Sequence, residues 1–172
     1  MDFIKFVSER YSVRNYDPLR KVEKEKLLRI IEAGRMAPSA ANRQPWKVLV
    51  VQSPENLKRL QTAYPANWFA NASTILVVKG MPDEAWTRKA DGYNAIETDL
   101  TIMMDHLILA AHAEDLSTCW IAAFDKQKLQ DALQLADNEV VFAITPLGYP
   151  VEGETATHPK TRKSLDEIVE WI

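Results

Sequence analysis

The sequence predicts a single domain of the α+β class, in which buried strands and amphipathic helices share one core. The chain has 172 residues, a usual length for one domain with a substantial core. Three short runs rich in valine and isoleucine are typical of buried strands, and they lie within 46–52, 73–79 and 139–149. Segments with helical periodicity separate these runs, and the longest of them covers 93–113.

The first half of the chain contains two helices before its first strand. A short helix is expected at 2–9 and an amphipathic one at 23–34. The strand at 46–52 is apolar on both faces from Val48 to Val51, so we expect it in the centre of the sheet. Ser53, an N-cap residue followed by proline, then begins a short helix that ends near residue 63.

Two aromatic segments flank the second strand. We expect a loop at 64–71, and a loop with one helical turn at 80–92. Their large side chains are Trp68, Phe69 and Trp86. The sequence does not decide whether these rings line a pocket or pack against the domain.

The helix at 93–113 is apolar over more of its circumference than a surface helix needs. We therefore expect neighbours on more than one side, and a second subunit is one candidate. Asp99 and His106 share a face of this helix among apolar residues, and we expect a polar pair at an interface rather than catalysis. A strand at 116–124 and a helix at 126–135, capped by Asp125, follow.

Composition excludes several classes of function. The formal net charge of −3 gives no electrostatic case for a nucleic acid or an anionic membrane as partner. No apolar run is long enough for a transmembrane helix, and one cysteine, Cys119, cannot form an intrachain disulfide, so we expect a cytoplasmic protein. The three histidines have no metal-ligand spacing, and the five glycines form neither GxGxxG nor a Walker loop.

Two local patterns suggest ligand binding. Arg10, Ser12 and Arg14 alternate, so in extended backbone their side chains point to one face, where they could trap a phosphate or simply be solvated. The loop at 37–46 is stiffened by two prolines, and it presents the amide side chains of Asn42 and Gln44. It could grip a flat heterocycle, or it could only fix a turn.

Four motifs now stand in order along the chain: RYSVR at 10–14, APSAANRQPW at 37–46, STCWIAAF at 117–124 and HPKTRKSLDEIVEW at 158–171. With them the chain resembles the compact branch of the nitroreductase family of FMN-dependent oxidoreductases. The resemblance implies a nitroreductase-like α+β fold, with a central mixed sheet of four or five strands and helices on both faces. It also implies one domain, 1–172, that forms an intertwined homodimer with FMN at the interface, and an arm at 150–172 that docks on the partner subunit.

The resemblance also implies which residues hold FMN. Those around its phosphate would be Arg10, Tyr11, Ser12, Arg14, Lys160 and Arg162. Those at the flavin ring or the ribityl chain, contributed by the other subunit, would be Pro38, Ser39, Ala40, Asn42 and Gln44. Backbone at Ile121, Ala122 and Ala123 would approach the reactive nitrogen; Ala122 stands where the family commonly has glycine, and alanine accepts fewer backbone angles.

The implied function is an FMN-dependent NAD(P)H oxidoreductase that reduces electron-poor acceptors, such as nitroaromatics or quinones, by ping-pong hydride transfer. NADH or NADPH would be a transient donor, and no catalytic side chain is predicted because the flavin carries the chemistry. The alternatives are a non-catalytic flavin-binding protein, and a relative that uses the same site for dehalogenation or dehydrogenation. A third alternative is that FMN is not bound and the basic residues form surface pairs.

Overall fold

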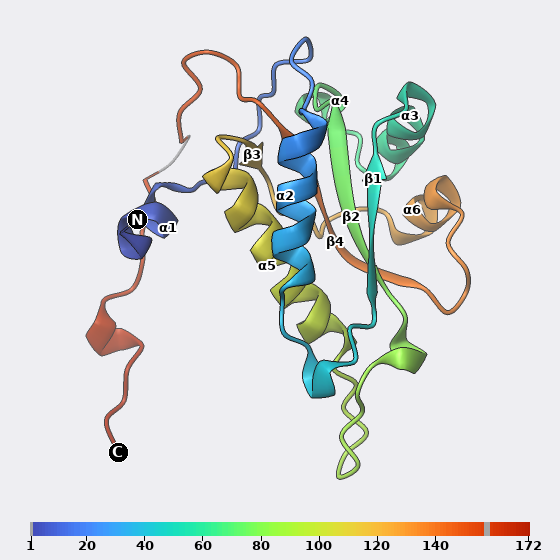
Figure 1. Cartoon of the computed structure of the whole chain (residues 1–172), viewed down its shortest axis with the longest axis vertical. Coiled ribbons are helices and arrows are strands. Elements are labelled where there is room, and N and C mark those ends of the chain that lie inside the picture. The colour runs from blue at the N-terminus through green and yellow to red at the C-terminus, as the bar shows by residue number, and fades with distance from the viewer. Residues whose placement is uncertain (1, 157–158) are drawn as a thin grey trace.

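A four-stranded sheet lies between two layers of helices in the computed structural model, which describes residues 2–156 and 159–172 (Figure 1). Across the sheet the strands are β1 (Trp46–Val51), β2 (Thr74–Gly80), β4 (Val140–Gly148) and β3 (Ser117–Thr118). All three pairings between these strands are antiparallel. A parallel element enters only as a bridge between Ser12 and Thr118, so the expectation of a mixed sheet holds only through this bridge.

One face of the sheet is covered by α2 (Lys24–Arg35) and α5 (Ile96–Ala113), which lie side by side (Figure 1). Residues buried in this layer include Leu27, Ile30, Leu76, Met103, Leu107 and Leu147. Two glycines, one in α2 and one in β2, allow these elements to pack closely against α5. A Cβ on Gly34 would lie 2.6 Å from Leu107 Cδ2, and one on Gly80 would lie 2.6 Å from Ile96 Cδ1.

The opposite face is covered by α3 (Pro54–Ala63), α4 (Asn67–Ala70) and α6 (Lys126–Leu133). Its core includes Leu60, Ile75, Val77, Leu129 and Ile144. The segment expected as an aromatic loop contains the one-turn helix α4 and packs here: Phe69 is 2% exposed, and Trp68 stacks on the buried Tyr16 at a centroid distance of 6.4 Å. These two rings therefore belong to the packed core.

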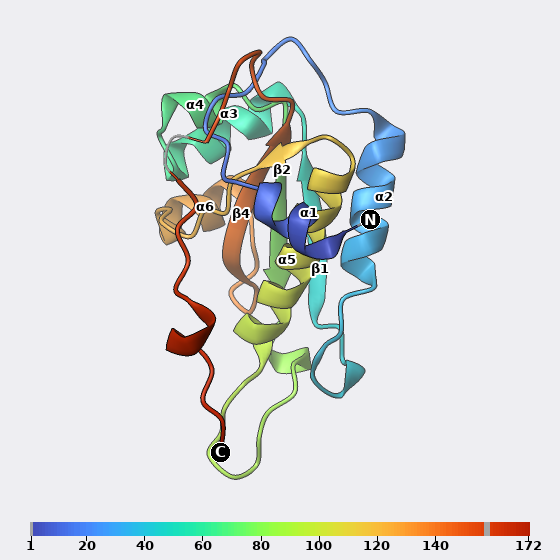
Figure 2. The ribbon, with the colours of Figure 1, turned by 90° about the vertical axis from the view of Figure 1, so that its left-hand side faces the viewer.

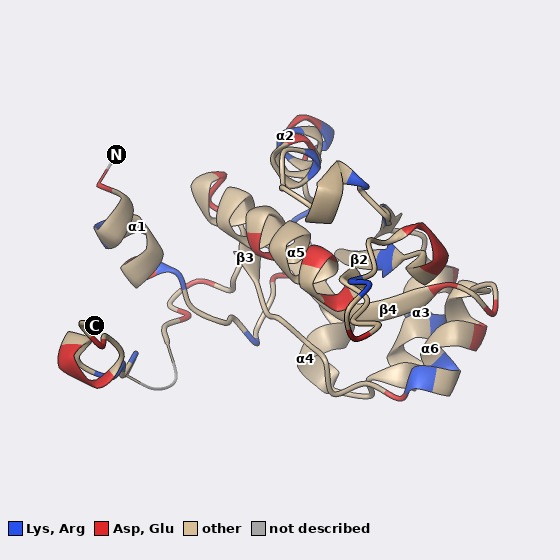
Figure 3. Cartoon of the chain, turned by 90° about the horizontal axis from the view of Figure 1, so that it is seen from below, with Lys and Arg blue, Asp and Glu red and all other residues tan. Residues whose placement is uncertain are grey.

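Both ends of the chain stand apart from this body. The N-terminal helix α1 (Phe3–Glu9) contains no buried residue, and the C-terminal segment 159–172, with its 3₁₀ turn η3 (Leu165–Glu167), is exposed throughout. Figures 2 and 3 show α1 and this segment lying outside the layers on the α5 side. His158, the first residue of the C-terminal motif, lies outside the described residues.

The expectation that the first strand is central is wrong, because within residues 2–156 and 159–172 β1 pairs with β2 alone and forms an edge of the sheet. Val48 and Leu49 are half-buried, while Val50 is 37% exposed. Apolar residues on both faces of a strand indicate that layers cover those faces. They carry no information about whether a second strand pairs with its free edge.

Three element boundaries also differ from expectation. Helix α5 begins at Ile96, because residues 87 and 94 first form a β-bridge and Asn94 Oδ1 accepts the N–H of Ile96. The strand expected at 116–124 shrinks to β3 and a bridge from Ile121 to Ile144. Two short 3₁₀ turns, η1 (Ala40–Asn42) and η2 (Pro82–Glu84), lie in the segments expected as loops. No helix of the described residues is long and apolar enough to span a bilayer.

Candidate functional site

The segment after α1 runs in extended form beside β3. The N–H of Val13 donates to the Thr118 carbonyl at 3.0 Å, and Ser12 forms its bridge with the same residue. Val13 is buried, whereas Arg14 is exposed and Arg10 and Ser12 are half-buried. The predicted alternation is therefore present: Val13 enters the core, and the polar residues on either side of it remain at least partly exposed.

The residue that follows Thr118 is Cys119, which is buried at 2% exposed. Burial raises the pKa of the Cys119 thiol, while Arg14, the Ser12 hydroxyl and Arg10 each oppose that rise. Arg10, Ser12 and Arg14 belong to the segment that pairs with Thr118, the residue before Cys119.

Lys160 joins this group from the other end of the chain. Its Nζ donates to the carbonyls of Val7 at 2.5 Å, Arg10 at 2.7 Å and Ser8 at 3.2 Å, at the C-terminal end of α1. Desolvation lowers the pKa of Lys160, and repulsion from Arg10 and Arg162 lowers it further. The structure thus brings basic residues from both termini together, as the sequence predicted.

We define the basic cluster as Arg10, Arg14, Lys160 and Arg162. Its positive charges are not balanced by carboxylates among the described residues. None of the four forms an ion pair with a carboxylate within residues 2–156 and 159–172. Like charges held at short range repel one another, as the pKa of Lys160 records. A bound anion with several acceptor oxygens, such as a phosphate, would neutralise them.

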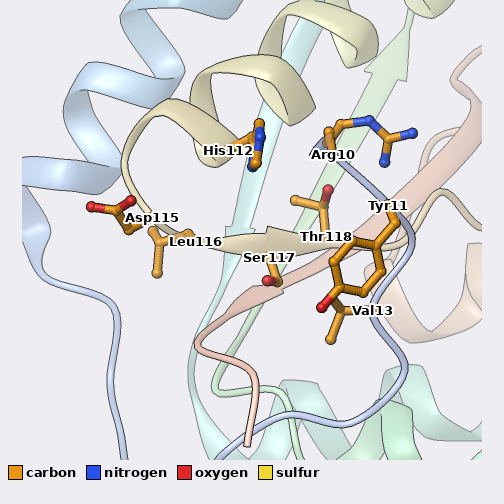
Figure 4. Close-up of a pocket in the computed structure, with 8 residues that line it drawn as sticks. All are labelled: Arg10, Tyr11, Val13, His112, Asp115, Leu116, Ser117 and Thr118. Carbon is orange, nitrogen blue, oxygen red and sulfur yellow. The ribbon is translucent and has the colours of Figure 1, made fainter. Parts of the chain in front are cut away.

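A cavity of about 200 Å³ lies next to the cluster (Figure 4). Arg10 and Tyr11 border it from the N-terminal segment, His112 from the end of α5 and Ser117 from β3. The Tyr11 hydroxyl donates to the Glu154 carbonyl at 3.1 Å, and burial, followed by the Glu154 carboxylate, raises its pKa. Tyr11 therefore anchors the chain after β4 rather than presenting its hydroxyl to a ligand.

The loop at 37–46 lies at the opposite end of α5 and is held by its own polar groups. Ser39 Oγ accepts the N–H of Gln44 at 2.9 Å, and the Gln44 side chain donates to the Asn42 carbonyl at 3.1 Å. The N–H of Ala40 donates to Asp99 Oδ1 at 2.9 Å. Pro38 and Asn42 are exposed. The loop is thus closed by its own hydrogen bonds, with Asn42 and Gln44 exposed, and its contact with a ligand stays a prediction.

The loop and the basic cluster are not brought together within one chain. Asp99 contacts the loop and His112 borders the cavity by the cluster, and thirteen helical steps of 1.5 Å place these residues ~20 Å apart along α5. The loop and the basic cluster therefore lie toward opposite ends of α5 within one chain.

The third predicted contact lies at 121–123. Ile121 is buried, and both its N–H and its carbonyl are bonded to Ile144, so Ile121 offers no free N–H to a ligand. Ala122 and Ala123 are exposed. Ala122 is not among the described residues with positive φ, so alanine fits this position without strain.

A groove of about 300 Å³ runs from Ala122 past the start of α5. Phe124 and Phe142 give it apolar walls, and Glu97 and Lys126 give it one charge of each sign. A flat molecule lying against the backbone at 122–123 would find apolar surface here. This groove was not predicted from the sequence, because its walls come from three separate elements.

The expected pair of Asp99 and His106 is wrong. Asp99 is buried and bonds to the loop through Ala40, while His106 Nδ1 lies 2.9 Å from the carbonyl of Ile102 in its own helix. The sequence shows Asp99 as a polar residue on an apolar helix face but does not reveal its partner. The only signal was that placement, because Ala40 is 59 positions away.

Comparisons with known proteins agree with the order of the motifs. The sequence profile of the nitroreductase family matches residues 7–68 and 61–149. A crystal structure of a nitroreductase family protein from Clostridium difficile 630 superposes with a TM-score of 0.91, at 35% identity over 99% of this chain and 98% of that one.

Two further relatives carry more specific names. A solved structure described as an FMN-dependent nitroreductase, from Clostridium difficile R20291, has a TM-score of 0.75 and 27% identity over 90% of this chain and 91% of that one. A protein of Archaeoglobus fulgidus, provisionally named NADH dehydrogenase/NAD(P)H nitroreductase, is 28% identical over 96% of this chain and 95% of its own length.

Proposed function

The chain belongs to the nitroreductase family, and from this we propose that it is a homodimeric, FMN-dependent NAD(P)H oxidoreductase. The cofactor and donor are suggested by the names of relatives that match nearly all of the chain. Electron-poor compounds, such as nitroaromatics or quinones, are the proposed acceptors. The observation that carries the proposal is the uncompensated basic cluster beside β3, built from both ends of the chain.

The residues at this cluster suit the phosphate of FMN. Arg10 and Arg14 have guanidinium groups without a carboxylate partner among the described residues, and Ser12 adds a hydroxyl donor. Arg162 lies near Lys160 and adds to the positive potential of the cluster. Guanidinium groups bind phosphate in a forked geometry, so this donor set favours a terminal phosphate over a neutral group.

A second subunit would complete the site. Since the cluster and the loop at 37–46 lie toward opposite ends of α5 in one chain, we propose that the partner's loop meets the flavin ring. Pro38, Ser39 and Ala40 would contact the ring, and Asn42 and Gln44 its polar edge. This arrangement assigns half of each site to each subunit, so dimer formation and cofactor binding depend on each other.

The arm would hold the two subunits together. Leu165, Ile168 and Trp171 are 74%, 63% and 94% exposed, so their apolar surface has no cover within the chain. A groove of about 490 Å³ follows the free edge of β1, between α3 and α6. An unpaired strand edge readily accepts another strand. We propose that the partner's arm lies along this edge, which would explain the apolar character that made β1 resemble a central strand.

FMN, when bound, supplies hydride acceptance and delivery. The protein's contribution is binding, orientation and electrostatics. The N–H groups of Ala122 and Ala123, which have no backbone partner among the described residues, are donors available to a flavin edge. The groove lined by Phe124 and Phe142 would hold a flat donor or acceptor against that edge.

The test compares FMN with riboflavin, which lacks the phosphate. We expect the purified dimer to bind FMN more tightly than riboflavin, and Arg14→Met to remove most of that difference while riboflavin affinity stays unchanged. Lys163→Met serves as a control, since Lys163 is a nearby exposed cation outside the assigned set. Equal affinity of the Arg14→Met and wild-type proteins for FMN would contradict the phosphate assignment.

The catalytic part of the proposal is tested by anaerobic addition of NADH and then NADPH to the FMN-loaded protein. Bleaching of the flavin absorption band, followed by recovery when a quinone or nitroaromatic is added, is the expected result. A band that neither donor bleaches would instead favour a flavin-binding protein without turnover.

A further inference from the structure

One carboxylate oxygen of Asp99 is buried in a way that does not stabilise the chain. The side chain is 1% exposed, and its Oδ1 accepts the N–H of Ala40 at 2.9 Å. Its Oδ2 is buried and has no hydrogen-bond partner within residues 2–156 and 159–172. A buried carboxylate oxygen without a donor destabilises the folded state, and such oxygens are rare in native structures.

The loop that Asp99 holds is strained. Ala41, Asn42 and Gln44 have φ values of 51°, 54° and 52°, in the left-handed region that side chains with a Cβ disfavour. Only two other non-glycine residues of the described chain, Asp115 and Gln134, share this property. Strained backbone persists only where its surroundings determine it, and it concentrates at functional sites.

The Ala40–Asp99 hydrogen bond connects the middle of this loop to α5. The two ends of the loop are attached by main-chain bonds, from the N–H of Ala37 to the Gly34 carbonyl and from the N–H of Met81 to the Pro45 carbonyl. The side-chain bonds of Ser39 and Gln44 stay within the loop. Asp99 lies in the first turn of α5, where the helix dipole favours a negative charge. The bond to Asp99 thereby fixes the position of the loop backbone at Ala40 relative to α5.

We propose that Asp99 is a positioning residue, which holds the loop at 37–46 in the shape that meets the flavin ring at the expense of the stability of the chain. This inference rests on the proposed function, because it assigns the purpose of the loop to flavin binding. Asp99 itself touches no ligand. It acts through Ala40, and one of its oxygens remains unsatisfied as a consequence.

Two variants of Asp99 separate its hydrogen bond to the loop from its negative charge. Asp99→Leu keeps the branched shape but removes the acceptor, and we expect roughly tenfold weaker binding of FMN and of riboflavin alike, the size that loss of one hydrogen bond corresponds to. Asp99→Asn keeps an acceptor for the N–H of Ala40, and we expect it to restore most of the affinity. Asp105→Asn, an exposed position on the same helix, is the control and is expected to bind as the wild type.

The stability of the flavin-free protein distinguishes positioning from a plain structural role. We expect the urea midpoint of the Asp99→Leu protein to equal or exceed that of the wild type, because the substitution removes an unsatisfied buried oxygen. A lower midpoint that parallels the loss of affinity would overturn the proposal, and so would unchanged flavin affinity in Asp99→Leu. An Asp99→Asn protein as impaired as Asp99→Leu would also overturn it.

Comparing the affinities for FMN and for riboflavin distinguishes a failure of this inference from a failure of the proposed function. A wild-type protein that binds neither flavin contradicts the proposed function. A wild-type protein that binds FMN, with an Asp99→Leu variant that binds it equally well, contradicts only the role of Asp99. A loss confined to FMN, with riboflavin unaffected, would place Asp99 at the phosphate end and would likewise reject the positioning role.

Discussion

The ammonium of Lys160 donates to the main-chain carbonyl of Arg10 at 2.7 Å, and this bond joins two segments separated by 150 positions. The same ammonium donates to the carbonyls of Val7 and Ser8. A lysine has three donors, and in this arrangement all three meet main-chain carbonyls. Lys160 therefore closes the C-terminal end of α1 and fixes the backbone of Arg10, and its direct contact with a phosphate stays a prediction.

We predict that Lys160 acts on FMN affinity through Arg10. Each of Lys160→Met and Arg10→Met should weaken FMN binding, and the double variant should bind about as weakly as Arg10→Met alone. Fluorescence titration of FMN into all four proteins of the cycle measures this coupling. Losses that add up in the double variant would instead indicate that Lys160 contacts the phosphate independently.

The arm can be tested apart from the basic cluster. A chain that ends at Arg162 retains Lys160 and Arg162 but lacks the exposed apolar residues of 165–172. We expect its dimer to dissociate at protein concentrations where the full chain remains dimeric, because the free edge of β1 loses its proposed cover. Sedimentation velocity over a concentration series measures this. An equally stable truncated dimer would refute the docking of the arm.

Lys79 and Glu139 form an ion pair that is largely buried, with side chains 14% and 16% exposed. The hydrogen bond from Lys79 lowers the pKa of the Glu139 carboxyl, and the Ala136 N–H lowers it further. A carboxyl with a lowered folded-state pKa stabilises the fold above its unfolded-state pKa of ~4.3, and this stabilisation disappears as pH falls through the folded-state value.

We therefore predict that Glu139→Gln lowers the free energy of unfolding by about 2 kcal/mol at pH 7, the scale of a hydrogen bond to a charged group. The difference between variant and wild type should shrink once pH falls below ~4. Urea unfolding at several pH values measures it. A difference that is the same in acid and at neutral pH would show that the effect arises from packing and not from the charge.

Gly80 permits the close contact between β2 and the start of α5. A Cβ there would lie 2.6 Å from Ile96 Cδ1 and 2.9 Å from Leu100 Cδ1, so Gly80→Ala should cost roughly 1–3 kcal/mol of stability. Gly148→Ala in the neighbouring strand is the matched control. Its Cβ would meet Tyr16 at 3.3 Å, a contact that small adjustments relieve. Equal effects of the two substitutions in urea unfolding would refute the steric argument.

Features set by local sequence were predictable. Ser53 and Asp125 cap α3 and α6 as expected, because each side chain accepts an N–H three residues ahead. The buried strands β2 and β4 were evident from their apolar runs. The approach of Lys160 to Arg10 was also expected, because the family resemblance implies that basic residues from both ends of the chain lie at one phosphate.

Features set by distant contacts were not predictable. The edge position of β1 depends on strand order, and apolar residues record only that layers cover the two faces. The partner of Asp99 and the carbonyls bound by Lys160 are main-chain groups, which any residue type could supply. The sequence therefore indicated candidate side chains for the site, and their hydrogen-bond partners depended on geometry that it does not encode.

The ~20 Å between the two ends of α5 has a genetic consequence. If each site takes its basic cluster from one subunit and its loop from the other, two inactive variants should complement each other. A chain with a defective cluster (Arg14→Met), mixed with a chain with a defective loop (Asn42→Leu), would form hybrid dimers with one intact site and one doubly damaged site. Co-expression should then restore activity that neither parent possesses.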